Sequence, residues 1–162
     1  HGPVHVLYPM IIDLAQFLKL RELFISAAEG IKMGRLLHGV MFEVPSACLQ
    51  ADELLAEADF GSIGTNDLIQ YLFAVDRNNA LVAYDYTPDR PVLWNVIRDL
   101  IGAAARAGKH MAVCGEMAGD PKYVLKLMGI GVKCVSVSSR LVPGVRAVAD
   151  VFGKTVVGPG SA

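Results

Sequence analysis

The sequence has few cysteines, no excess of either charge and no long apolar run. Its three cysteines, Cys48, Cys114 and Cys134, form no CxxC pair, so neither a disulfide framework nor a zinc site is expected, and a reducing, cytoplasmic setting is favoured. The 15 basic and 16 acidic residues leave a net charge of -1, which argues against a nucleic-acid-binding surface. No apolar run reaches the roughly 18 residues of a membrane span, and the first residues do not have the pattern expected of a signal peptide.

What the chain does have is an unusually apolar composition for a soluble domain. Hydrophobic residues make up 53% of the 162 residues, and the mean hydropathy is +0.42. A chain of this length is long enough to bury one real core. Strands that are buried on both faces, as in a parallel sheet covered by helices, account for such apolarity.

Apolar runs typical of strands alternate with amphipathic stretches typical of helices. Strands are expected at residues 4–8, 39–43, 60–63, 111–114 and 134–137. Helices are expected at about residues 13–32, 47–58, 67–74, 91–107, 121–128 and 143–152. The polar stretch 75–89 is expected to be a long loop, and such loops are often functional. Five strand–helix repeats indicate an α/β fold, and length alone favours an open, doubly wound sheet over a (βα)8 barrel, which typically needs about 250 residues.

Polar side chains stand where three of the expected strands end. Glu43 ends one apolar strand, the pair Asn66 and Asp67 follows the next, and Cys114 ends a third. Ligands of α/β proteins bind at the carboxyl ends of strands, so parallel, neighbouring strands would gather these groups in one pocket. Two hard oxygen ligands and one titratable thiol predict a metal-assisted enzyme site.

Four motifs in a fixed order resemble the phosphoenolpyruvate (PEP)-utilising enzymes, and most closely the enzyme I type of phosphotransferase. They are GVMFEVPSA at 39–47, FGSIGTNDLIQY at 60–71, AVDR at 74–77 and CGEMAGD at 114–120. The resemblance covers about residues 4–148. It implies that residues 1–152 are roughly the last five βα units of a PEP-binding (βα)8 TIM barrel, a partial barrel, and that residues 153–162 are a tail.

The resemblance also implies which residues bind metal and substrate. Glu43 and Asp67 resemble the two carboxylates that hold Mg²⁺, a cation that prefers a few carboxylates together with phosphate oxygens and water. Asp67 also lies beside the substrate in that family, Asn66 resembles a phosphate contact, and Arg77 resembles an arginine that binds PEP, for which a planar guanidinium is well suited.

Cys114 resembles the general acid that protonates C3 of enolpyruvate to give pyruvate. A thiol with an ordinary pKa near 8.5 is mostly protonated at neutral pH, as this role requires. Gly115 would let the backbone approach the ligand. Taken singly, each of these residues has an ordinary interpretation: Glu43 or Asp67 as a cap or surface carboxylate, and Arg77 as a solvated loop charge. Only their joint spacing favours a site.

The resemblance implies transfer of a phosphoryl group from PEP to an enzyme histidine and then to a phosphocarrier protein of the sugar phosphotransferase system, by a homodimer. The family's phosphohistidine region and the arginines of its earlier strands have no match here, so the isolated chain is expected to be inactive. Two alternatives stay open. The chain is a fragment of a pyruvate phosphate dikinase or PEP synthase, or it is a non-catalytic module that dimerises or senses PEP.

Overall fold

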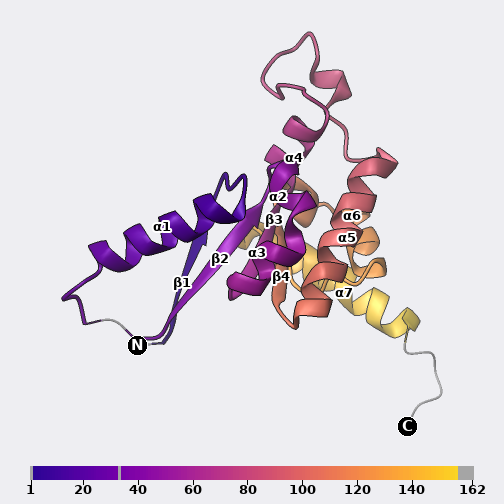
Figure 1. Cartoon of the computed structure of the whole chain (residues 1–162). Coiled ribbons are helices and arrows are strands. Elements are labelled where there is room, and N and C mark those ends of the chain that lie inside the picture. Colours follow the sequence, from indigo (N-terminus) through magenta and orange to yellow (C-terminus); the bar gives the residue numbers. More distant parts are fainter. Residues whose placement is uncertain (1, 33, 157–162) are drawn as a thin grey trace.

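The fold is an α/β arrangement built on one parallel sheet, and the computed structural model describes residues 2–32 and 34–156. Figure 1 shows the sheet running across the middle of the molecule, with helices along it. The four strands are β1 (Val4–Tyr8), β2 (Leu36–Phe42), β3 (Phe60–Gly64) and β4 (His110–Cys114). Each of them was expected from its apolar run, with bounds that differ by no more than three residues.

The strands lie in the order in which they occur in the chain, β1-β2-β3-β4, and all neighbours are parallel. A doubly wound sheet would reverse its order at a switch point, and no reversal occurs among the described strands. A sequential parallel order is that of a barrel wall. The sheet is therefore an incomplete (βα)8 barrel, as the motif resemblance implies, and not the open sheet that length alone favours.

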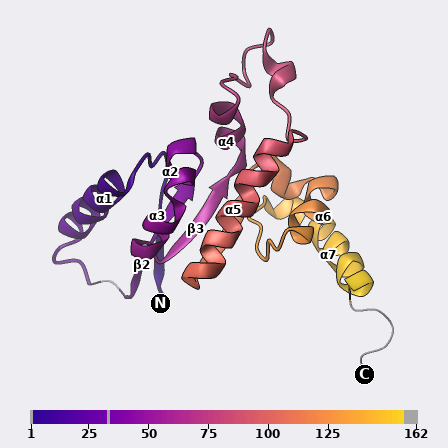
Figure 2. The same ribbon diagram turned by 45° about the vertical axis from the view of Figure 1, so that its right-hand side comes forward.

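Helices connect the strands and cover the outer face of this wall, and Figure 2 shows α3 and α5 lying along β3. They are α1 (Leu14–Ala27), α2 (Pro45–Leu49), α3 (Ala51–Glu57), α4 (Thr65–Leu72), α5 (Pro91–Ala107), α6 (Pro121–Gly129) and α7 (Val142–Val156). Three single 3-10 turns complete them: η1 (Ala83–Asp85), η2 (Glu116–Gly119) and η3 (Ser139–Leu141). None of the described helices is long and apolar enough to cross a bilayer.

The core lies between the sheet and these helices. Outward-facing strand residues such as Phe42, Ile63 and Val113 are fully buried, and they join one cluster with Leu54 of α3 and Ile97 of α5. Side chains on a strand alternate between its two faces, so the next residues along each strand point the other way. These inner residues line an open hollow of 410 Å³ that includes Leu7, Leu37, Phe60, Ser62 and Ala112.

Local signals explain where several helices begin and end. Helix α5 starts at Pro91, whose ring suits the first helical turn, and it ends before Gly108, which has φ +63°. A glycine in that left-handed conformation is a common helix stop. Helix α1 begins after Asp13, whose carboxylate accepts a hydrogen bond from the Gln16 N–H group at 2.7 Å. It ends at Ala27, five residues before the expected end at Lys32.

The fifth strand, expected at residues 134–137, is reduced to one parallel bridge between Val113 and Val135. The Val113 N–H group donates to Cys134 O at 3.0 Å, and the Ser136 N–H group donates to Val113 O at 2.8 Å. In the described residues this segment meets strand β4 on one side only, whereas a central parallel strand is held from both sides. The expected helix at 47–58 is also interrupted at Gln50, which separates α2 from α3. Most of the expected tail, residues 157–162, lies outside the described residues.

Candidate active site at the carboxyl ends of β2, β3 and β4

The expected site residues come from the ends of three adjacent strands. Glu43 directly follows β2, Asn66 and Asp67 lie in the first turn of α4 directly after β3, and Cys114 is the last residue of β4. Gly64 of β3 is paired with Cys114 in the register of the sheet. Adjacent strands lie about 4.8 Å apart, so the sheet itself brings the carboxylates and the thiol to one edge.

Glu43 is fixed by backbone groups. The residue is 3% exposed, and its Oε1 atom accepts a hydrogen bond of 2.8 Å from the Met10 N–H group. Met10 follows β1 and has a φ of +55°, a left-handed conformation that is uncommon for a residue with a side chain. The other oxygen, Oε2, lies over Gly64, where an added Cβ atom would stand 2.5 Å from it. Glycine at position 64 therefore makes room for the carboxylate.

Burial raises the pKa of Glu43, the Met10 hydrogen bond partly opposes this, and the charge of Asp67 raises it further. The two carboxylates thus lie close enough to repel each other, and a bound cation would offset that repulsion. The described residues contain no group of three or more His, Cys, Asp and Glu side chains arranged as a metal site. Two carboxylates that leave most positions to water and substrate oxygens suit Mg²⁺, so the residues present fit this ion.

Replacing Glu43 by glutamine should stabilise the metal-free protein at neutral pH. Gln keeps an oxygen for the Met10 N–H group and removes a buried charge. Because the folded-state pKa of Glu43 is raised, ionisation costs stability above that pKa, and the cost vanishes below the unfolded value of 4.5. The midpoint of thermal unfolding should rise by roughly 3 °C, or about 1 kcal/mol in a domain of this size.

The gain from Glu43→Gln should shrink as pH falls below 4.5, because wild-type Glu43 is then neutral in both states. Calorimetry at several pH values measures it. Glu53→Gln is the control, since Glu53 is exposed on α3 and its replacement should leave the midpoint unchanged. A Glu43→Gln variant that is less stable than wild type at pH 7 would contradict the raised pKa of Glu43.

The Cys114 thiol lies among groups that keep it protonated. Its Sγ accepts a hydrogen bond from the Ser62 hydroxyl at 3.7 Å, and its S–H group donates to Ile63 O at 3.4 Å. Burial raises the pKa of Cys114, the Ser62 hydrogen bond lowers it, and the charges of Glu43 and Asp67 raise it. At neutral pH the thiol therefore carries a proton, which makes it able to act as an acid.

Two side-chain hydrogen bonds tie the junction after β3 to the junction after β4. The Thr65 hydroxyl donates to Cys114 O at 2.7 Å, and Asn66 Oδ1 accepts from the Glu116 N–H group at 2.9 Å. Gly115 lies between them with a φ of +99°. Since the Asn66 oxygen is engaged, its amide nitrogen is the group with donors for an anion.

Arg77 comes from the long segment 75–89 that follows α4, and it does not belong to a strand end. Figure 1 shows this segment rising away from the sheet. The Arg77 main-chain N–H group donates to Gln70 Oε1 at 3.3 Å, and its guanidinium lies close enough to the Tyr86 hydroxyl to lower the pKa of that phenol. Tyr86 in turn lines a cavity of 240 Å³ together with Asn66 and Glu116. The structure thus joins Arg77 to the other site residues through Tyr86.

Sequence reasoning missed several groups that hold the site. Ser62 has a detectable signal, because it lies two residues before Gly64 and must face the same side of β3. Met10 and Tyr86 have none, since the first acts through its backbone and the second lies in a loop. Their partners Glu43 and Asn66 lie 33 and 20 residues away in the chain.

Comparison with known proteins identifies the family to which the chain belongs. The model of the family described as "PEP-utilising enzyme, PEP-binding domain" matches residues 1–152. The Phosphoenolpyruvate-protein phosphotransferase of Lactococcus lactis subsp. cremoris is 39% identical over 88% of this chain and 26% of its own length. That of Geobacillus stearothermophilus is 38% identical over 91% of this chain and 26% of its own length. Multiphosphoryl transfer protein 1 of Escherichia coli is 36% identical over 90% of this chain and 18% of its own length.

Two solved structures share the fold at low sequence identity. A citrate lyase from Burkholderia xenovorans has a TM-score of 0.69 at 14% identity, with 89% of this chain and 48% of the other covered. A citrate synthase variant has a TM-score of 0.60 at 12% identity, with 94% of this chain and 63% of the other covered. The chain spans about a quarter of the length of the phosphotransferases that it resembles. Its match over residues 1–152 makes it a member of the PEP-binding domain family of the PEP-utilising enzymes.

Proposed function

We propose that this chain is the C-terminal PEP-binding part of a Mg²⁺-dependent PEP-protein phosphotransferase. In this reaction the phosphoryl group of PEP passes to a histidine elsewhere on the enzyme and then to a phosphocarrier protein, and pyruvate is released. One observation carries the proposal: in a member of this family, two carboxylates and a protonated thiol lie at the ends of three adjacent parallel strands.

Substrate binding in this proposal depends on three kinds of group. Glu43, through its Oε2 atom, and Asp67 would hold Mg²⁺, which when bound would neutralise part of the negative charge of PEP. The Asn66 amide nitrogen donates to a phosphate oxygen, and Arg77 offers a planar fork of donors to phosphate or carboxylate. The engaged Oε1 and Oδ1 atoms of Glu43 and Asn66 keep both side chains from rotating.

The proton for pyruvate comes from Cys114. After the phosphoryl group has left, the enolate carries a negative charge that is shared with C3. The S–H bond of Cys114 breaks, a C–H bond forms at C3, and the sulfur is left as a thiolate. The Ser62 hydroxyl, which lies 3.7 Å from the sulfur, donates to that thiolate until solvent returns a proton.

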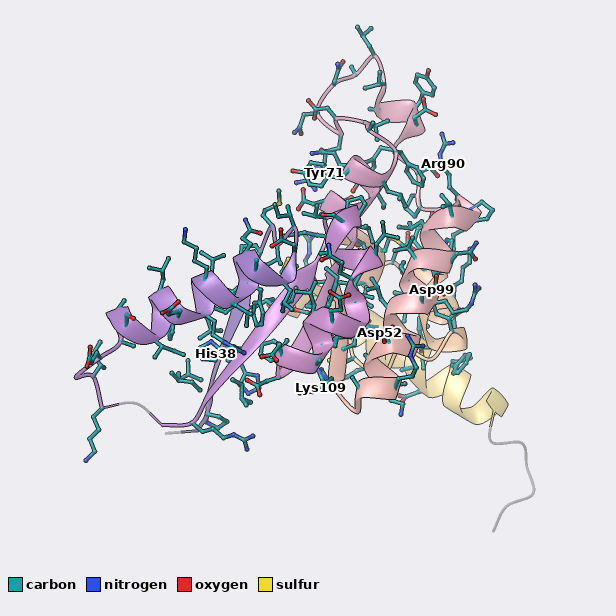
Figure 3. The ribbon with its side chains drawn as sticks, in the orientation of Figure 1. His38, Asp52, Tyr71, Arg90, Asp99 and Lys109 are labelled. Carbon is teal, nitrogen blue, oxygen red and sulfur yellow. The ribbon has the colours of Figure 1, made fainter. Side chains whose placement is uncertain are left out.

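The proposal is tested first by metal binding. Mn²⁺ is a paramagnetic substitute for Mg²⁺, and titration of the protein should enhance water proton relaxation in wild type but much less in Asp67→Ala. Asp99→Ala serves as the control, because Asp99 lies exposed on α5, outside the site (Figure 3). Equal enhancement in wild type and Asp67→Ala would remove Asp67 from the metal site. PEP turnover by the complete enzyme then separates a phosphotransferase from a non-catalytic, PEP-sensing module.

The proposal includes self-association. The inner face of the sheet carries an open hollow of 410 Å³, and the apolar residues Leu23 and Ile25 of α1 are 57% and 53% exposed. Apolar surfaces of this kind mark interfaces, and open sheet edges invite pairing. Light scattering of the isolated chain at micromolar concentration should therefore give the mass of a dimer or larger species. A stable monomer that unfolds cooperatively would contradict this expectation.

A further inference from the structure

One loop hydroxyl, that of Tyr86, makes contact with both the start of α4 and the arginine of the site. Tyr86 stands near the end of segment 75–89, and its side chain is half-buried. Its hydroxyl donates to the main-chain oxygen of Asn66 at 3.2 Å. The side chain of Arg77, at the other end of the segment, lies close enough to this hydroxyl to lower the pKa of Tyr86. Tyr86 thus closes the long segment back onto the site.

The hydroxyl is chemically suited to hold two groups at once. A phenol has one O–H donor and lone pairs that accept, so it can donate to the Asn66 oxygen while it accepts from a guanidinium. Burial raises the pKa of Tyr86, Arg77 lowers it, and the charges of Glu116 and Asp67 raise it. The phenol therefore stays protonated at neutral pH and keeps its donor. A phenolate would lose the bond to Asn66.

The residues on either side of Tyr86 in the chain are anchored by contacts of their own. Asp85 forms an ion pair with Arg90, whose guanidinium lies 5.2 Å from the centre of the Phe73 ring, and Figure 3 shows Arg90 at the start of α5. The indole N–H group of Trp94, which is buried, donates to Pro88 O at 2.6 Å. These contacts anchor the end of the segment to α5, so the backbone that carries Tyr86 is held in a fixed position.

Arg77 has no comparable anchoring contacts among those described above. It lies at an exposed position early in the segment, and its main chain is held by one hydrogen bond to Gln70. An arginine side chain has many rotamers, and ordering it on binding is costly. We propose that Tyr86 is a positioning residue: its hydroxyl ties the Arg77 guanidinium to the start of α4 and so presets the arginine for an anionic substrate. For the identity of that substrate, PEP, the inference rests on the proposed function.

The alternative is that Tyr86 only forms a wall of the 240 Å³ cavity. Phenylalanine keeps the ring and loses only the hydroxyl, so Tyr86→Phe distinguishes the two roles. Tyr84→Phe is a matched control, because Tyr84 is in the same segment, carries the same chemical change and is 77% exposed. Both variants keep the apolar surface of the ring, which protects the fold.

The first measurement needs no substrate. Amide hydrogen exchange of residues 76–83 should be several-fold faster in Tyr86→Phe than in wild type, and unchanged in Tyr84→Phe. Exchange that is equal in all three proteins would overturn the inference, whatever the reaction of the protein proves to be. A protein without PEP activity would refute the proposed function, but this measurement would still decide whether the hydroxyl orders the Arg77 segment.

The second measurement uses the complete phosphotransferase. Tyr86→Phe should raise the KM for PEP by about tenfold, the effect of one hydrogen bond to a charged group, while kcat changes much less. On an Arg77→Gln background the same change should have almost no further effect, because residues that act through one another are not additive. An unchanged KM, or full additivity with Arg77→Gln, would overturn the positioning role.

Discussion

Replacing Cys114 by alanine in the complete enzyme should lower the rate of pyruvate formation by roughly 10²- to 10⁴-fold, the usual contribution of general acid catalysis. The affinity for PEP should change little, because the thiol donates to Ile63 O and accepts from Ser62 in the substrate-free site. Rapid-quench experiments that follow phosphoenzyme formation and pyruvate release separately would measure the rate of each step in wild type and in Cys114→Ala. Unchanged turnover, or a loss confined to affinity, would remove Cys114 from the acid role.

The pH dependence gives an independent check of this role. The acid must be protonated, and the pKa of Cys114 is raised above its ordinary value by burial and by the charges of Glu43 and Asp67. Pyruvate formation should therefore stay constant through neutral pH and fall only above pH 9. Ser62→Ala removes a hydrogen bond that favours the thiolate, so it should move the alkaline limb to still higher pH. A rate of pyruvate formation that already falls below pH 8 would indicate a different acid.

Gly115→Ala should damage both the backbone and the site. The φ of Gly115 is +99° and its ψ is -177°, a region that is essentially restricted to glycine and costs about 1–3 kcal/mol for other residues. An added Cβ atom would also overlap Thr65 Oγ1 and stand 2.8 Å from Asn66 Oδ1. Those two atoms make the hydrogen bonds that tie the junctions after β3 and β4 together.

Both stability and activity should therefore fall in Gly115→Ala, the free energy of unfolding by about 3 kcal/mol from strain and overpacking and the turnover of PEP by about 10²-fold or more from displacement of Cys114. Chemical denaturation and turnover assays measure the two effects. Gly108→Ala is the matched control, since Gly108 also has a positive φ but has open space around it and lies at the far end of the strands. It should lose some stability and no activity.

Parts of the fold with strong local signals could be predicted from the sequence. Helix α5 begins and ends where the sequence predicts, because Pro91 and Gly108 each fix a local backbone conformation. The four paired strands agree with the prediction because short, mostly apolar segments of five to seven residues suit a sheet that is covered by helices. The gathering of Glu43, Asp67 and Cys114 at one edge follows from the same reasoning, since parallel neighbouring strands all end on one side.

What could not be predicted depends on contacts between distant segments. The segment at 134–137 has the apolar pattern of a strand, yet its pairing is limited to β4 among the described residues, and a sequence pattern does not show which neighbours are present. The Met10 N–H group that fixes Glu43 is a backbone donor, so no side-chain motif marks it. Tyr86 lies in a segment of turn residues whose path onto Asn66 is set by Trp94 of α5 and by Arg90, which directly precedes that helix.

Because all the described strands are parallel, the two edges of the sheet differ in how well they should tolerate insertions. Every strand runs the same way, so Met10, Glu43, Asn66 and Cys114 all lie where strands finish, while the turns that lead into strands lie at the opposite end. The turn at Gly108, between α5 and β4, is exposed and has open space around it. A peptide tag or fluorescent label could be inserted at this turn as a handle for purification or imaging, because loop insertions far from packed residues are well tolerated.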